Sequence, residues 1–138
     1  MANNPRTASL RWSGEGMVFE GRVASEALTM IDGDSAAGPS PMELLLMSLA
    51  GCMAIDIRMI LEKSRVDVKE LAVRIEGMRA DEEPKRFTRI EMVFELTGPT
   101  PDDDHRVARA IQLSRDKYCS VHHTLRPDLE VTTSYSLT

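Results

Sequence analysis

The sequence is poor in basic residues relative to acidic ones, which limits its possible partners. Of 138 residues, 17 are Lys or Arg and 22 are Asp or Glu, so the formal net charge is −5. Proteins that bind nucleic acid usually carry a basic surface. This charge balance therefore disfavours nucleic acid as a partner, and it gives no reason to expect binding to an anionic membrane surface.

Segments that would export the chain or insert it into a bilayer are also lacking. The first seven residues contain no apolar core behind a basic start, so no secretory signal is expected. The richest apolar stretch, residues 44–57, is short for a membrane span and is interrupted by Ser48, Gly51 and Asp56. We therefore expect a cytoplasmic protein without a membrane-spanning helix.

Cysteine is scarce as well, since the chain contains only Cys52 and Cys119. Two cysteines are too few for the disulfide framework of a small secreted protein. In a reducing compartment such a pair serves for packing, as part of a metal site, or for redox chemistry.

What the sequence does contain is a regular pattern of strands and helices. Apolar residues alternate with polar ones in six segments, which predicts strands at residues 8–12, 17–21, 27–31, 68–75, 90–96 and 129–137. Helical spacing predicts one long helix from Ser40 and a second from Thr100 to Cys119, followed by a short turn. We expect residues 1–138 to form one α+β domain, with two main helices on one face of a mostly antiparallel sheet.

The start of the first helix is marked most clearly. Ser40 is suited to the N-cap, Pro41 to the first helical position, and Glu43 to the third position of a capping box. The helix that follows is apolar on nearly all sides, which predicts that most of its surface is buried.

Two segments carry a specific resemblance to a known family. They are GPSPMELLLMSLAGC, residues 38–52, and DKYCSVHHTLRPDLEV, residues 116–131. Both are similar to motifs of the OsmC/Ohr family, in particular its YhfA-like branch, and the order of strands and helices around them matches. The resemblance covers nearly the whole chain.

The resemblance implies an OsmC-like fold, with mostly antiparallel sheets and two main helices, and an intertwined homodimer with sites at the subunit interface. It also implies that Cys52 attacks a peroxide, that Cys119 resolves the product as a disulfide, and that thiols such as lipoyl groups reduce the site again. An arginine from the N-terminal strands fills the activating role in the family. The sequence does not choose between Arg11 and Arg22, and it implies no cofactor and no metal.

Taken without the resemblance, the cysteines allow a simpler interpretation. Cys52 lies in mid-helix among small and apolar residues, where a cysteine is by default a small buried hydrophobe. A cysteine that attacks peroxide must be a thiolate. Position 52 is too far from the helix start for the helix dipole to stabilise it, so a cation brought in by the fold is required. Arg86 and Arg89 are further candidates.

The chain departs from the family at the start of the first helix. In hydroperoxidase members a glutamate follows the proline and orients the arginine, whereas this chain has Met42 there and Glu43 one position later. Glu43 is explained by the capping box, and it lies on the opposite side of the helix from Cys52. This departure leaves open whether the chain turns over alkyl hydroperoxides.

The two histidines that follow Cys119 give a weaker signal. The Cys-x-x-His spacing of Cys119 and His122 occurs in metal sites, but zinc needs more ligands than these segments supply. His122 or His123 could instead tune a thiol or carry a proton. A partly exposed turn histidine is the simpler interpretation.

Two functions therefore remain open. The first is a thiol-dependent peroxidase that reduces organic or hydrogen peroxides in stress protection. The alternative is a non-peroxidatic OsmC-like dimer that binds a small apolar or thiol ligand.

Overall fold

The computed structural model describes residues 4–138, and the chain divides into two compact units, Met1–Leu45 and Leu46–Thr138. The first unit is a three-stranded antiparallel meander with strand order β1-β2-β3. Its strands are β1 (Ala8–Trp12), β2 (Val18–Val23) and β3 (Leu28–Asp32), as the alternation predicted.

The loop after β3 is held by the carboxylate of Asp32. This carboxylate accepts hydrogen bonds from the backbone N–H groups of Ala37 at 2.8 Å, Asp34 at 2.9 Å and Ala36 at 3.2 Å. These bonds, led by that of Ala37, lower the pKa of Asp32 because they favour the charged form. The loop conformation is therefore coupled to an ionised Asp32.

Helix α1 (Pro41–Lys63) begins with the predicted capping box. The N–H of Ser40 donates to Glu43 Oε1 at 2.9 Å, and the N–H of Glu43 donates to Ser40 Oγ at 3.3 Å. Ser35 Oγ also donates to Glu43 Oε1. The bonds from Ser35 and Ser40 lower the pKa of Glu43. The capping role predicted for Glu43 is confirmed.

The second unit contains a three-stranded sheet, in which a helical segment, residues 101–124, lies between two neighbouring strands in the sequence. The strand order is β4 (Glu70–Arg79), β5 (Phe87–Thr97) and β6 (Glu130–Leu137). The pair β4 and β5 forms an antiparallel hairpin, but β6 runs parallel to β5. The residue pattern taken alone predicted a single sheet, whereas the strands form two three-stranded, mostly antiparallel sheets, as the resemblance implied. The helical connection returns the chain to the starting end of β5, which makes β6 parallel.

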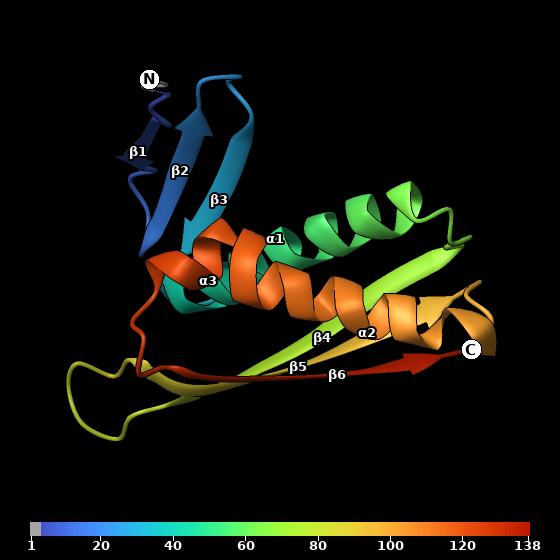
Figure 1. The fold of residues 1–138 in the computed structure, drawn as a ribbon. Helices are drawn as coiled ribbons and strands as arrows, with labels where there is room; N and C mark the ends of the chain where they lie inside the picture. Colours follow the sequence, from blue (N-terminus) through green and yellow to red (C-terminus); the bar gives the residue numbers. More distant parts are fainter. Residues whose placement is uncertain (1–3) are drawn as a thin grey trace. The chain divides into compact units, whose positions relative to one another are not determined.

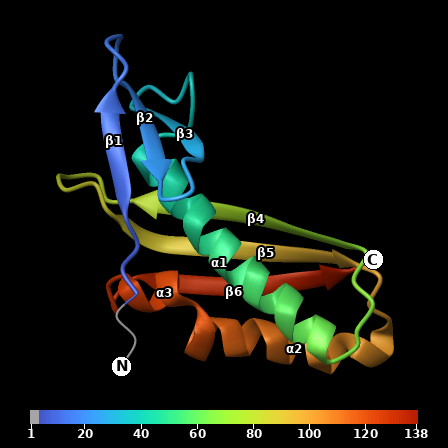
Figure 2. The same ribbon diagram turned by 90° about the horizontal axis from the view of Figure 1, so that it is seen from above.

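Helices α1 and α2 (Asp104–Leu113) lie over the same face of this second sheet (Figures 1 and 2). The central strand β5 alternates buried and more exposed residues, as a strand with one covered face must. The core combines side chains of α1, β5 and α2: Leu49, Met53, Ile57, Leu61, Ile90, Met92, Phe94, Leu96, Val107, Ala110 and Ile111.

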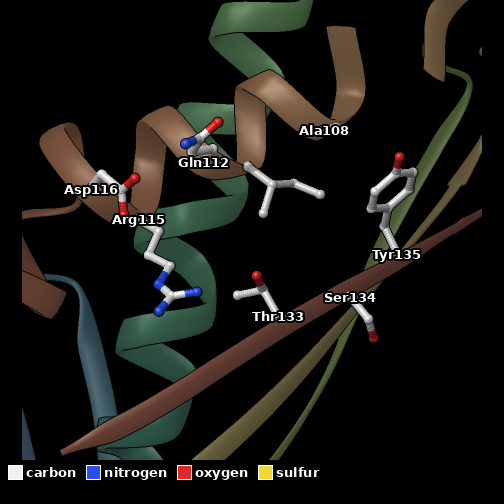
Figure 3. A pocket seen from close by; sticks show the side chains of 8 residues that line it. Ala108, Gln112, Arg115, Asp116, Thr133, Ser134 and Tyr135 are labelled. Carbon is white, nitrogen blue, oxygen red and sulfur yellow. The ribbon is translucent and has the colours of Figure 1, made fainter. Parts of the chain in front are cut away.

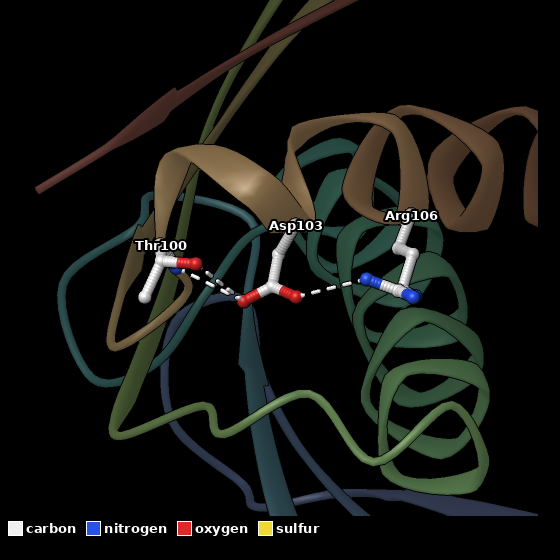
Figure 4. Close-up of polar contacts among 3 residues, drawn as sticks. All are labelled: Thr100, Asp103 and Arg106. Atoms are coloured by element: carbon white, nitrogen blue, oxygen red, sulfur yellow. Dashed lines mark hydrogen bonds and ion pairs between the residues drawn. The ribbon is translucent and has the colours of Figure 1, made fainter.

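The second predicted helix is in fact three consecutive segments, and the short turn predicted after it is a helix. A 3₁₀ turn, η1 (Pro101–Asp103), leads into α2, which passes into a π-helical turn, η2 (Ser114–Tyr118), and then into the short helix α3 (Ser120–Thr124). At the start, Asp103 accepts a hydrogen bond from the N–H of Thr100 at 3.0 Å and forms an ion pair with Arg106 at 3.2 Å (Figure 4). Asp103 thus satisfies a free N–H at the N-terminus.

Helix α1 is more apolar than expected for a chain that was predicted to have no membrane-spanning helix. An 18-residue window within Pro41–Lys63 has a mean hydropathy of 2.0, so the helix is long and apolar enough to cross a membrane by length and composition. The core helix of a soluble protein meets the same criterion. Here Leu49, Met53, Ile57 and Leu61, spaced one turn apart, are fully buried in the core.

Candidate functional site: the thiol pair

Cys52 and Cys119 meet within the second unit, although they lie on different helical segments. Cys52 is on α1 and Cys119 is the residue between η2 and α3. Both are free thiols, and their side chains are close enough to interact through a hydrogen bond. Cys119 has no exposed surface, whereas Cys52 is partly exposed. The sequence left the separation of the two sulfurs undetermined, and the fold brings them together.

The π-helical turn η2 positions Cys119. The N–H of Cys119 donates to the carbonyl of Ser114 at 2.7 Å, which is the five-residue step of a π-helix. Cys119 then serves as the N-cap of α3, because its sulfur accepts a hydrogen bond from the N–H of His122 at 3.3 Å. Both its backbone and its sulfur are therefore fixed.

Two polar residues that were not predicted to belong to the site, Asp56 and Ser114, lie beside the thiols. Asp56 follows Cys52 by one turn of α1 and exerts a Coulombic effect on Cys119. Ser114 Oγ donates to Asp56 Oδ2 at 2.8 Å. The available signal was a polar side chain on an otherwise apolar helix face, which usually has a specific partner.

The surroundings of Cys119 hold it in the thiol form. Burial raises the pKa of Cys119 from its ordinary value of 9.0 to about 11, because a thiolate loses its hydration there. The N–H of His122 opposes this increase, while the Cys52 thiol and the Asp56 carboxylate add to it. At neutral pH Cys119 is therefore protonated.

His122 and His123 do not face the sulfur as ligands. The Nδ1 of His122 lies 3.0 Å from the carbonyl oxygen of Arg115, and its ring meets that of His123 edge-on, with the centroids 5.4 Å apart. Among residues 4–138, no three His, Cys, Asp or Glu side chains gather in a way that could hold a metal ion.

The arginines named as activators lie in several places. Arg11 and Arg22 are exposed residues of β1 and β2 in the first unit, where Arg22 donates to the carbonyl of Glu26 at 3.3 Å. In the second unit, Arg89 pairs with Glu91 at 3.1 Å and Arg86 donates to the carbonyl of Phe87 at 3.3 Å. The arginine that would activate Cys52 remains a prediction.

Two open cavities lie beside the helical segments of the second unit. One, of about 520 Å³, is lined by Asp56 and by other residues of α1, α2 and η2: Met59, Ile60, Lys63, Ser64, Arg109, Leu113 and Tyr118. Another of about 520 Å³ lies between α2 and β6, with Arg115 at one end and Tyr135 at the other (Figure 3). Neither cysteine lines either cavity, but the former includes Asp56, which lies beside the thiols.

Comparison with known proteins gives the family of the chain. Residues 32–134 match the family model described as OsmC-like protein. The protein YhfA of Escherichia coli strain K12 is 42% identical over 131 residues, which cover 94% of this chain and 96% of YhfA.

Solved structures agree with this match. A hypothetical protein from Aquifex aeolicus VF5 is 26% identical and superimposes with a TM-score of 0.86, covering 99% of this chain and 98% of that one. An organic hydroperoxide resistance protein OsmC from Legionella pneumophila, 14% identical, has the same fold with a TM-score of 0.70, each chain being covered to 99%. The match of both sequence and structure shows that this chain belongs to the OsmC-like protein family.

Proposed function

We propose that the protein is a thiol-dependent peroxidase in which Cys52 is the attacking cysteine and Cys119 the resolving one. The observation that carries this proposal is that two free thiols, which differ in exposure, lie close enough to interact. The partly exposed Cys52 can meet a peroxide, while the buried Cys119 can meet only Cys52. Distant members of the same fold are named organic hydroperoxide resistance proteins, which supports the assignment.

The proposed reaction has two steps. The Cys52 thiolate attacks one peroxide oxygen, the O–O bond breaks, and the second oxygen leaves as an alcohol or water after taking a proton. The resulting sulfenic acid is then attacked by the sulfur of Cys119. The S–O bond breaks, a disulfide forms, and the thiol proton leaves with the hydroxide as water. Two external thiols, for example a dihydrolipoyl group, reduce the disulfide again.

The proposed assembly is a homodimer in the cytoplasm. On α1, three large apolar side chains remain exposed in the single chain: Met47 at 51%, Ile55 at 62% and Met59 at 51%. They are spaced at multiples of four residues and so share one face of the helix. Exposed apolar stripes of this kind are typical of protein interfaces. A second copy would cover this face, and either Arg11 or Arg22 would then supply the cation near Cys52.

Counting thiols tests the proposed activity. The reduced protein is mixed with cumene hydroperoxide, and free thiols are titrated with a chromogenic disulfide. We expect the loss of two thiols per chain, no disulfide in Cys52→Ser, and a trapped sulfenic acid in Cys119→Ser. Thiols that remain unchanged in the wild-type protein would reject the peroxidase.

A second function rests on Met42, which occupies the position of the family glutamate at the start of α1. A methionine cannot orient an arginine, and it makes its surroundings more apolar. The alternative protein binds a small apolar or thiol ligand and does not turn over peroxide. Replacing the residue as Met42→Glu separates the two functions, because a gain of peroxide turnover over an inactive wild type supports the alternative.

A further inference from the structure

Ser114 is one of two polar or charged residues that are buried in the described chain, the other being Asp32. Its hydroxyl has no exposed surface, and it donates to Asp56 Oδ2 at 2.8 Å. The two residues are 58 positions apart in the sequence. Burying a hydroxyl is unfavourable unless a partner accepts its hydrogen bond. Ser114 and Asp56 therefore form a specific link between η2 and α1.

This link ends at the two segments that carry the thiols. Ser114 begins the π-helical turn η2, and its carbonyl accepts the N–H of Cys119 at 2.7 Å. Asp56 lies one helical turn after Cys52, so both face the same side of α1. One hydrogen bond between side chains thus connects the backbone that holds Cys119 to the helix that holds Cys52.

The charge at Asp56 also acts on Cys119. Burial is the main cause of the raised pKa of Cys119, and the Cys52 thiol and the Asp56 carboxylate are the ionisable groups that add to it. His122 contacts Cys119 through its backbone N–H, and its ring nitrogen is directed to the carbonyl of Arg115. Asp56 is therefore the carboxylate whose effect on Cys119 can be removed by a single substitution.

We propose that Asp56 is a positioning residue for Cys119: its hydrogen bond with Ser114 fixes the π-helical turn so that Cys119 faces Cys52, and its negative charge adds to burial in disfavouring a second thiolate beside Cys52. The consequence for catalysis rests on the proposed peroxidase function. Cys119 stays protonated while Cys52 reacts with the peroxide. In the second step, the proton of Cys119 leaves with the hydroxide as water.

Two substitutions separate the two parts of the proposal. Asp56→Asn removes the charge but keeps an amide oxygen that accepts the hydrogen bond of Ser114. Ser114→Ala removes the hydrogen bond but keeps the charge. Glu62→Gln is the matched control, because Glu62 is an exposed carboxylate of the same helix that lies 3.8 Å from Arg58. Thermal melting of each variant identifies any that fail to fold.

The first measurement is the pKa of Cys119 in the reduced full-length protein, followed by NMR of ¹³Cβ-labelled cysteine and without any peroxide. Removing a nearby negative charge favours the thiolate and so lowers the pKa of the thiol, although by less than burial raises it. We expect this decrease in Asp56→Asn and none in Glu62→Gln. A folded Asp56→Asn protein with the wild-type Cys119 pKa overturns the role of the charge.

The second measurement is the rate at which diamide closes the Cys52–Cys119 disulfide. Diamide oxidises two thiols to a disulfide and is itself reduced to the hydrazine, so the test does not depend on peroxidase activity. We expect closure to be several-fold slower in Ser114→Ala than in wild type, and unchanged in Ser136→Ala, the control on the exposed side of β6. Equal rates in folded Ser114→Ala and wild type overturn the positioning role. If both expected results are obtained but the protein does not reduce peroxide, the proposed peroxidase function is rejected and the positioning role of Asp56 stands.

Discussion

The sulfur of Cys119 accepts a hydrogen bond from the backbone N–H of His122 at 3.3 Å, so the residue that pairs with Cys52 also caps helix α3. A capping side chain is held in one rotamer by the helix that it caps. The buried thiol is thereby fixed in direction before any reaction begins. This leaves Cys52, the partly exposed partner, as the thiol to which a peroxide has access.

Alkali should destabilise the protein through Cys119. Its pKa is raised in the folded state to about 11, from an ordinary value of 9.0. The folded chain therefore binds this proton more tightly than the unfolded chain, and the resulting stabilisation is complete below pH 9.0 and is lost as the pH rises toward 11. Two pKa units correspond to about 2–3 kcal/mol.

Urea unfolding of the reduced protein between pH 8 and 11 measures this loss, with Cys119→Ala as the control because lysines and tyrosines titrate in the same range. We expect the stability of wild type to fall more steeply than that of Cys119→Ala. Parallel curves for the two proteins would contradict a raised pKa.

Acid should release the loop that follows β3. Asp32 accepts three backbone hydrogen bonds, and its pKa is lowered from 3.8. The stabilisation is present above pH 3.8 and disappears as the pH falls through the lower pKa of the folded state. Asp32→Asn should be less stable than wild type at pH 7, and the difference should shrink in acid. A constant difference across the acid range, measured by urea unfolding, would show that charge is not the cause.

The core of the second unit should be sensitive to the length of the side chain at position 57. Ile57 is completely buried on the inner face of α1. Ile57→Ala should lower the free energy of unfolding by about 2–5 kcal/mol and Ile57→Val by about 0.5–1.5 kcal/mol, because each deletion leaves a cavity. Urea titration provides both values. Equal and small losses in the two variants would indicate that this face of α1 is loosely packed.

The exposed apolar stripe of α1 should hold the proposed dimer together. Ile55 is 62% exposed in the single chain, although it lies in the middle of the most apolar helix. Ile55→Glu would place an unpaired charge in the interface, and we expect monomers by light scattering coupled to gel filtration. Ser136→Glu adds the same charge on β6 and should remain a dimer. A dimeric Ile55→Glu protein would assign the interface to another surface.

Several features of the fold were predictable because their signals are local. The capping box of Ser40 and Glu43 needs only neighbouring residues, and the structure contains it. Likewise, the alternation along β5 follows from burial of one face of a strand, and its even-numbered residues from Ile90 to Leu96 are buried. The motif around Cys52 was enough to indicate the family, which the comparisons confirm.

Other features depend on contacts between distant segments. The change from α-helix to π-helix at Ser114 has no local signal, since Ser114 fits the apolar face of α2 by spacing and becomes special only through Asp56. The parallel direction of β6 is decided by where α2 returns the chain.

By itself, the sequence predicted the strands, the two main helices, the start of α1 and the two cysteines as candidate site residues. Only the tertiary structure decided that the sulfurs meet, that one is buried, and that a carboxylate lies beside them. The physical reason is that hydrogen bonding and periodicity act over a few residues, whereas burial and electrostatic effects on a thiol depend on atoms that folding brings from elsewhere in the chain.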